Sequence, residues 1–126
     1  MKFLLDTHVL IWSLQDNERL SHQIKTLIND ANNEIYISAA SIWEIAIKSS
    51  LNKINLSVDE ILETLQHSDY YPLPITFFHT AKIIHLPHYH HDPFDRILIA
   101  QAWIEEMTLI THDAKIQQYD ISILFI

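Results

Sequence analysis

Short apolar runs separated by longer amphipathic stretches recur along the chain, and this pattern predicts alternating strands and helices. Residues 2–5 and 108–111 are nearly continuous in apolar side chains, and Ile35 and Ile37 alternate with Tyr36. Such runs are typical of a parallel sheet that helices cover on both faces. Strands are predicted at residues 2–5, 34–38, 71–75, 108–111 and 122–126. Two prolines place the third of these strands toward an edge of the sheet.

The stretches between the strands predict helices. Ser21 is a candidate N-cap for an apolar stripe, and Ser57 with Glu60 three residues later forms a capping-box pattern. Helices are predicted at residues 9–14, 20–31, 41–50, 57–65, 77–86 and 94–106. The third is apolar on most sides and is expected to be buried. The fold class is therefore α/β, a three-layer α/β/α sandwich with a mostly parallel central sheet.

The composition excludes several kinds of site. The 126 residues include no cysteine, which rules out a disulfide framework and a thiolate metal site. They include no glycine, which excludes the P-loop and the glycine-rich dinucleotide turn. Any metal ion must therefore be held by carboxylates, imidazoles or water.

The charge bears on the partner. A net charge of −8, from 8 basic and 16 acidic residues, argues against nucleic acid. The objection weakens if four acids belong to a metal site, because setting them aside leaves −4. The apolar stretches are too short to span a bilayer and no early stretch resembles a signal peptide, so we expect a cytoplasmic protein with no membrane contact.

Four acids occupy places where a parallel sheet would bring them together. Asp6 and Asp113 each follow a predicted strand directly, so both fall at the carboxyl edge of the sheet, where such folds bind ligands. Glu44 and Asp95 lie in apolar helices that are expected to begin near the same edge. Carboxylates among apolar residues are costly unless a cation or hydrogen bonds compensate them. A divalent cation is the simplest shared partner.

This donor set predicts a metal-dependent hydrolase. Hydrolysis of a phosphodiester needs an activated water and neutralised phosphoryl oxygens, and Mg²⁺ or Mn²⁺ supplies both. Hard cations of this kind prefer oxygen ligands and keep several waters. The alternative gives each acid a separate role, with Asp6 and Asp95 as helix caps and Asp113 as a turn residue. It does not explain Glu44 inside an apolar helix, so the metal site is the preferred hypothesis.

Four segments together resemble PIN-domain proteins, and most of all the VapC-type ribonuclease toxins of bacterial toxin–antitoxin pairs. The segments are residues 4–10 (LLDTHVL), 41–45 (SIWEI), 91–96 (HDPFDR) followed by 99–102 (IAQA), and 109–113 (LITHD). The resemblance runs in order over essentially the whole chain. It implies that residues 1–126 form a single PIN-like nuclease domain.

The resemblance also implies an activity and partners. The activity would be a Mg²⁺- or Mn²⁺-dependent endoribonuclease, with RNA as substrate. The partners would be a second copy in a homodimer and a small cognate antitoxin, which would lay an amphipathic helix in an apolar groove and reach the acids with an Arg or Lys. The acidic cluster that it assigns to catalysis and metal binding consists of Asp6, Glu44, Asp95 and Asp113.

Two further residues follow from the same resemblance. Asp92 is a second candidate metal ligand, because Asp92 and Asp95 flank the Pro-Phe pair of the third segment. Thr7 matches a position where a small hydroxyl residue hydrogen-bonds the site. Asp113 corresponds to the most variable acid of the family and is expected to assist, in part through water.

The basic residues near these segments leave alternatives open. Arg96 is expected either to contact substrate phosphate or to pair with Asp92, and Lys48 either to contact phosphate or to pair with Glu44 one helical turn away. The histidines also allow a competing zinc site, although their spacing matches no standard zinc signature. The histidines concerned are His88, His90, His91 and His112. His8 and His112 are instead candidates to face the cavity and contact phosphate.

Two other functions remain as alternatives. A non-catalytic PIN-like module would keep the fold and bind a partner protein. A receiver-like phosphoacceptor would also use Mg²⁺ beside its first strand, but it would need a lysine at the end of the last strand, and residues 120–126 contain none.

Overall fold

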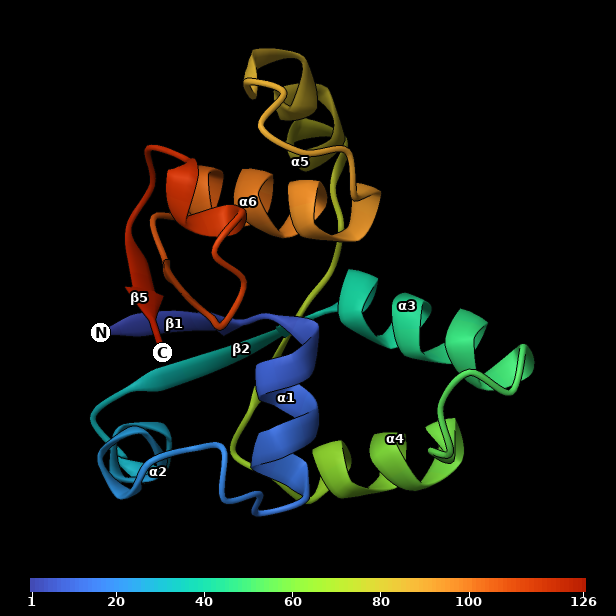
Figure 1. Cartoon of the computed structure of the whole chain (residues 1–126). Helices are drawn as coiled ribbons and strands as arrows, with labels where there is room; N and C mark the ends of the chain where they lie inside the picture. The colour runs from blue at the N-terminus through green and yellow to red at the C-terminus, as the bar shows by residue number, and fades with distance from the viewer.

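The computed structural model describes all residues from 1 to 126 and contains one parallel sheet of five strands (Figure 1). The order across the sheet is β3-β2-β1-β4-β5, so the first strand lies at its centre. Leu4 pairs with Tyr36 on one side and with Leu109 on the other. The strands are β1 (Lys2–Leu5), β2 (Glu34–Ser38), β3 (Tyr71–Leu73), β4 (Thr108–Thr111) and β5 (Ile123–Phe125). The predicted parallel sheet is confirmed, and β3 is an edge strand.

Helices connect the strands as predicted. They are α1 (Thr7–Leu14), α2 (His22–Asn29), α3 (Ala39–Ser50), α4 (Val58–Gln66), α5 (Phe77–Lys82) and α6 (Pro93–Glu105), with short 3₁₀ turns at Ile83–His85 and Ile116–Gln118. Ser21 and Ser57 are N-caps, each accepting a backbone N–H three residues on. Only this half of the capping box at Ser57 is formed. The complete box occurs at α5 instead, between Thr76 and His79.

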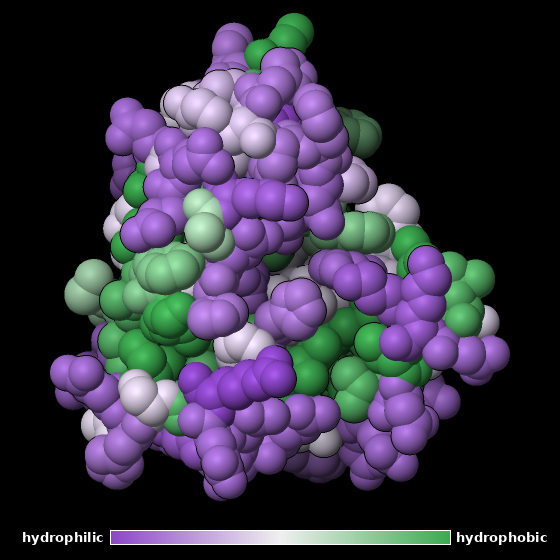
Figure 2. Space-filling model, in the orientation of Figure 1, coloured by the Kyte–Doolittle hydropathy of each residue, from purple (hydrophilic) through white to green (hydrophobic).

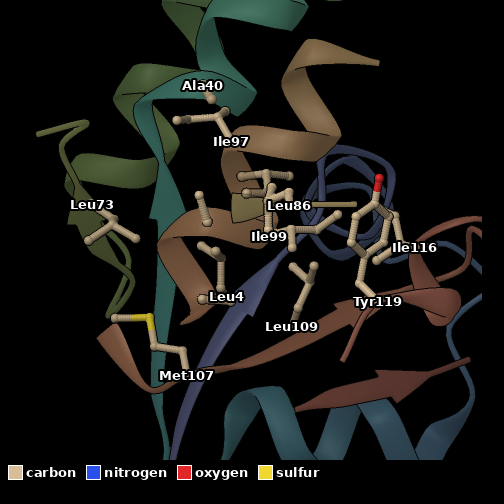
Figure 3. Close-up of a cluster of buried hydrophobic side chains, with 13 residues drawn as sticks. Leu4, Ala40, Leu73, Leu86, Ile97, Ile99, Met107, Leu109, Ile116 and Tyr119 are labelled. Atoms are coloured by element: carbon tan, nitrogen blue, oxygen red, sulfur yellow. The ribbon is translucent and has the colours of Figure 1, made fainter. Parts of the chain in front are cut away.

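Two apolar layers pack against opposite faces of the sheet, because successive side chains of a strand point to opposite sides. Leu4 and Leu109 pack with α6 in one layer (Figure 3). Phe3, Leu5 and Ile110 pack with α1, α2, α3 and α4 in the other. Each fully buried Leu or Ile contributes about 1.5–3 kcal/mol. The three-layer sandwich is thus confirmed.

Helix α3 departs from the expectation of a buried helix. One face is buried and includes Glu44 and Ile45, whereas Trp43 is 57% exposed and Ile47 37% exposed. The reason is position: α3 leaves the edge of the sheet and extends beyond it (Figure 1). Trp43 packs edge-to-face against Phe94 at a ring-centroid distance of 5.0 Å, so it links α3 to the start of α6.

The helices are short. None is both long and apolar enough to cross a membrane.

Figure 2 shows the molecular surface in the orientation of Figure 1. The surface is hollowed between α3 and α6, and polar side chains separate two apolar areas. The carboxyl ends of the central strands and the first turns of α1, α3 and α6 converge behind this hollow (Figure 1).

Candidate active site

Asp6 lies at the carboxyl end of the central strand and is 4% exposed. Its Oδ1 accepts the Val9 backbone N–H at 2.9 Å, which caps α1, and its Oδ2 accepts the hydroxyl of Thr111. Burial raises the pKa of Asp6, and these hydrogen bonds oppose the rise. Asp6 therefore is a helix cap, as the alternative hypothesis had it, and also presents a buried carboxylate at the edge of the sheet.

Glu44 is held at both carboxylate oxygens. The Thr7 hydroxyl donates to Oε1 at 2.8 Å, and the Lys48 ammonium contacts Oε2 at 2.7 Å. The predicted pairing of Lys48 with Glu44 is confirmed, as is the hydrogen bond of Thr7 to the site. Because Glu44 is 6% exposed, these partners supply the compensation that a buried carboxylate needs.

The third segment uses its two acids differently. Asp92, not Asp95, is the N-cap of α6: its Oδ1 accepts the N–H of Phe94 at 2.9 Å and of Asp95 at 3.0 Å. The expectation that Asp95 caps the helix is wrong, because Pro93 begins the helix and puts Asp92 at the cap. Asp95 lies within the first turn, and its Oδ2 is 3.3 Å from His90 Nε2.

Asp113 follows β4 in a tight turn. Its Oδ1 accepts the Lys115 backbone N–H at 2.9 Å, and its own N–H donates to the Thr111 hydroxyl at 3.0 Å. Thr111 therefore joins Asp113 to Asp6 through one hydroxyl. The predicted turn role is confirmed, and the turn brings the carboxylate beside Asp6.

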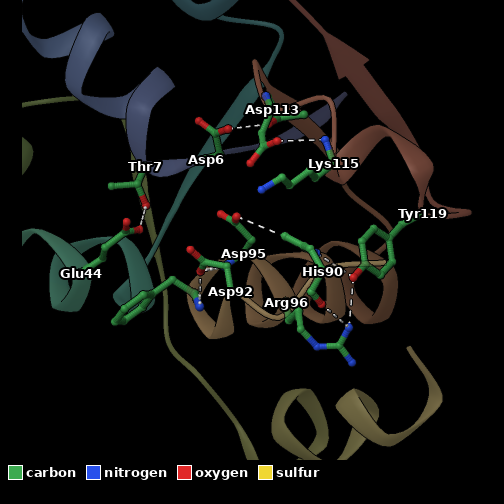
Figure 4. Close-up of polar contacts among 12 residues, drawn as sticks. Asp6, Thr7, Glu44, His90, Asp92, Asp95, Arg96, Asp113, Lys115 and Tyr119 are labelled. Atoms are coloured by element: carbon green, nitrogen blue, oxygen red, sulfur yellow. Dashed lines mark hydrogen bonds and ion pairs between the residues drawn. The ribbon is translucent and has the colours of Figure 1, made fainter. Parts of the chain in front are cut away.

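The electrostatics of Asp95 show that the predicted acids converge. Burial raises its pKa to about 7, together with the negative charges of Asp92, Asp113, Glu44 and Asp6 in decreasing order. Figure 4 shows Asp6, Asp95 and Asp113 pointing toward a common space from three elements, with the side chain of Lys115 extending into it. The four other acids predicted from the sequence thus lie near enough to Asp95 for their charges to act on it.

Arg96 does not face this space, so its expected contact with substrate phosphate finds no support in the structure. It is 6% exposed and donates to the carbonyl oxygens of Pro87 (2.7 Å) and Leu86 (3.3 Å) and to the Tyr119 hydroxyl (3.0 Å). The alternative pairing with Asp92 is not formed, because the guanidinium donates to these acceptors instead. Figure 4 shows it pointing away from the carboxylates. Buried next to a loop without regular structure, Arg96 satisfies backbone carbonyls.

A comparison with protein-family models matches residues 3–122 to the PIN domain. The chain belongs to the PIN-domain family. A search of the curated proteins finds no match. The resemblance first seen in four short segments is thus confirmed over nearly the whole chain.

Solved structures share the fold of this PIN domain. VapBC2 from Rickettsia felis, bound to a DNA fragment from its promoter, is 17% identical at a TM-score of 0.73, over 99% of this chain and 98% of that chain. FitAcB from Neisseria gonorrhoeae is 21% identical at a TM-score of 0.70, over 97% and 96%. VapBC-1 from nontypeable Haemophilus influenzae is 17% identical at a TM-score of 0.67, over 99% and 98%. At these identities the likeness shows the fold.

The carboxylates are oxygen ligands of the kind that a hard divalent cation prefers, but they do not form a compact ligand group. No three acids or histidines lie close enough together to form a ligand group. Mg²⁺ does not require one, because it binds through one or two carboxylates and keeps several waters. Burial and, after it, like-charge repulsion raise the pKa of Asp95, and a bound cation would relieve the repulsion. The absence of a group of three acids or histidines also leaves the competing histidine–zinc site without support. His90 is instead buried between Tyr119 and Asp95.

A hollow of about 360 Å³ adjoins the acids of the PIN domain. It is lined by Asp6, His8, Trp12, Arg19, His112, Asp113 and Ala114. The guanidinium of Arg19 lies 5.5 Å from the Trp12 ring centroid, and His112 meets the same ring edge-on at 5.4 Å. His8 and His112 thus face a cavity, as predicted. Sequence reasoning missed Arg19 and Lys115, because no motif marks either residue.

A larger apolar groove of about 810 Å³ lies away from the acids, between α3, α4 and the edge strand β3. Its apolar lining includes Ile42, Leu62, Leu65, Tyr71 and Leu73. It holds none of the candidate catalytic residues, so its chemistry suits an apolar partner surface better than a phosphate ester.

Proposed function

We propose that this PIN domain is a Mg²⁺- or Mn²⁺-dependent endoribonuclease and the toxin of a toxin–antitoxin pair. The observation that carries the proposal is that Asp6, Glu44, Asp92 and Asp113 lie near enough to Asp95 for their charges, after burial, to help raise its pKa to about 7. Membership of the PIN family supports it. So do the solved structures with the same fold, several of which are described as toxin–antitoxin complexes or as VapBC and FitAB assemblies.

Each acid would have a distinct part. Asp6 and Asp95 would hold the metal ion, with Asp113 and Glu44 assisting through water and Asp92 as the alternative ligand. The ion, when bound, would activate a water and neutralise charge on the phosphoryl oxygens. Thr7 and Lys48 fix the Glu44 carboxylate, and the Lys48 side chain is 39% exposed, so we propose that it also contacts a substrate phosphate.

The hollow beside the acids accounts for RNA binding by a protein of net charge −8. Arg19 is exposed there beside His8 and His112, and Lys115 extends beside the carboxylates, so two cationic side chains and two imidazoles gather where the RNA backbone would pass. Unpaired RNA bases bind to proteins by stacking on aromatic and guanidinium planes. We therefore propose that the substrate is single-stranded RNA and that the protein acts in the cytoplasm.

Metal removal provides the first test. We expect cleavage of total RNA to vanish in excess EDTA and to return on addition of Mg²⁺ or Mn²⁺, because no residue of the site replaces the Lewis acid. The reaction is followed by mapping new RNA ends, with untreated and heat-inactivated protein as controls. Cleavage that is undiminished in excess chelator would refute the proposal. Absence of cleavage with every metal would favour the non-catalytic module, which the capping roles of Asp6 and Asp92 also allow.

Two apolar surfaces suit the proposed protein partners. The groove between α3, α4 and β3 has the size and lining to receive an amphipathic helix of the antitoxin. A separate patch on and after α5 contains Phe77 (91% exposed), Phe78 (78%) and Ile84 (84%). Figure 2 shows apolar side chains at the α5 end of the molecule. Exposure of this extent is costly unless a second surface covers it, so we propose the patch as part of a homodimer interface.

Sedimentation tests the dimer. We expect the isolated chain to sediment as a dimer at micromolar concentration, and the double variant Phe77→Asp, Phe78→Asp to sediment as a folded monomer, because charge at the centre of an interface prevents its burial. Leu62→Asp in the apolar groove is the matched control and should leave the dimer intact. A monomeric wild-type chain across that range would contradict the homodimer.

A further inference from the structure

A buried chain of three side chains leads from α6 and the 116–118 turn to the Asp95 carboxylate. The Tyr119 hydroxyl lies 3.0 Å from Arg96 Nη1 and 2.8 Å from His90 Nδ1. The other ring nitrogen, His90 Nε2, lies 3.3 Å from Asp95 Oδ2. Arg96, His90 and Tyr119 are 6%, 8% and 4% exposed, so water does not compete freely for these contacts (Figure 4).

The direction of each hydrogen bond follows from the chemistry of the groups. A guanidinium can only donate, so Arg96 donates to the Tyr119 oxygen. The Tyr119 proton must then go to its remaining neighbour, His90 Nδ1, because the structure shows no third partner for this hydroxyl. If Nδ1 carried a proton instead, the buried phenolic O–H would have no acceptor, which is costly. His90 Nδ1 is therefore an acceptor, and its proton is on Nε2, facing Asp95.

We propose that His90 is a positioning residue: Arg96 and Tyr119 hold its ring as the Nε2–H tautomer, and that N–H fixes Asp95 Oδ2 and leaves Oδ1 for the metal. The role toward the metal rests on the proposed function. Hydrogen-bonded partners of this kind orient metal ligands, and their loss typically lowers metal affinity by roughly 10–100-fold.

The same residues tie down the loop before α6. Arg96 also donates to the carbonyl oxygens of Leu86, Pro87 and, at 3.4 Å, His90. These bonds span residues 86–90, so the loop that carries His90 is held by the helix that carries Asp95. His88 and His91 in the same loop are exposed and make only a tilted ring contact with each other at 5.9 Å. They are therefore natural controls.

The first test reads the tautomer without metal or substrate. Long-range ¹H–¹⁵N NMR of the metal-free protein distinguishes a protonated from an unprotonated ring nitrogen. We expect His90 to show a protonated Nε2 and an unprotonated Nδ1, and Tyr119→Phe to lose this preference while the protein stays folded. A wild-type ring protonated at Nδ1 would overturn the proposal, whatever the activity of the protein.

The second test measures Mn²⁺ affinity by calorimetry on folded protein in the absence of RNA. We expect His90→Ala to weaken Mn²⁺ binding about 10–100-fold, and His90→Gln, whose amide can donate in place of Nε2–H, to recover most of it. The control His88→Ala, His91→Ala should bind as the wild type does. Equal affinity of His90→Ala and wild type would contradict the positioning role.

The outcomes separate this inference from the proposed function. Mn²⁺ binding that depends on His90 in a protein that cleaves no RNA would sustain the inference and refute the nuclease. Wild-type protein that binds no Mn²⁺ would refute the metal-directed part of the inference, while RNA cleavage in EDTA would refute the proposed mechanism alone.

Discussion

We expect Asp6→Asn to lower RNA cleavage by roughly 10²–10⁴-fold while the protein stays folded. The change removes a charge that would bind the metal, and a metal ion supplies several kcal/mol of transition-state stabilisation, at about 1.4 kcal/mol for each factor of ten in rate. The fold should survive because Asn is as good an N-cap as Asp, so the bond from the Val9 N–H at 2.9 Å is kept. Single-turnover cleavage with saturating Mn²⁺ is the measurement.

A matched pair of variants identifies the ligand in the third segment. Asp95→Asn should reduce cleavage as strongly as Asp6→Asn does, whereas Asp92→Asn should matter less, because Asp92 is exposed and its Oδ1 is occupied by two backbone N–H groups. The opposite order would transfer the ligand role to Asp92. Near-normal activity of Asp6→Asn would refute the assignment of the acidic cluster.

We expect Asp95→Asn to stabilise the metal-free protein at pH 8 by about 1–3 kcal/mol, since one pKa unit corresponds to about 1.4 kcal/mol. The folded-state pKa of Asp95 is about 7, against 3.8 for an unperturbed carboxyl, because it is buried among other acids. Between these values the folded state binds the extra proton, so the free energy of unfolding falls as the pH rises from about 4 to about 7 and is then level. Because Asn cannot ionise, the free energy of unfolding of the variant does not fall in this way as the pH rises.

Thermal unfolding in EDTA at pH 5 and pH 8 measures the effect. The stabilisation by Asp95→Asn should be much smaller at pH 5, where the wild-type carboxyl is already protonated in the folded state. Asp120→Asn, at an exposed position, is the control and should change the melting temperature little at either pH. Added Mg²⁺ should stabilise the wild type more than the variant. A variant that is less stable than the wild type at pH 8 would contradict the raised pKa of Asp95.

Local features of the fold were predictable because they depend on neighbours in the sequence. The apolar runs predicted all five strands, and the position of Asp6 and Asp113 after two of them predicted the edge at which they meet. The pair of Lys48 with Glu44 followed from a spacing of one helical turn. The resemblance in four segments extended this to the acids and to Thr7, whose hydrogen bond to Glu44 spans 37 residues.

Other features were decided only when the elements packed. Nothing near Arg96 in the sequence indicates that it turns away from the acids, because its partners are backbone carbonyls of the 86–90 loop and the hydroxyl of Tyr119. In the sequence, His90 is likewise indistinguishable from His88 and His91, and only the folded structure buries it against Tyr119 and Asp95. The exposed face of α3 depends on where the sheet ends. The sequence thus determined the strands, most helix starts and the identity of the candidate acids, since strand pattern, capping and spacing are local. The direction of side chains in loops and at helix ends is set instead by hydrogen-bond partners that only the tertiary fold brings near.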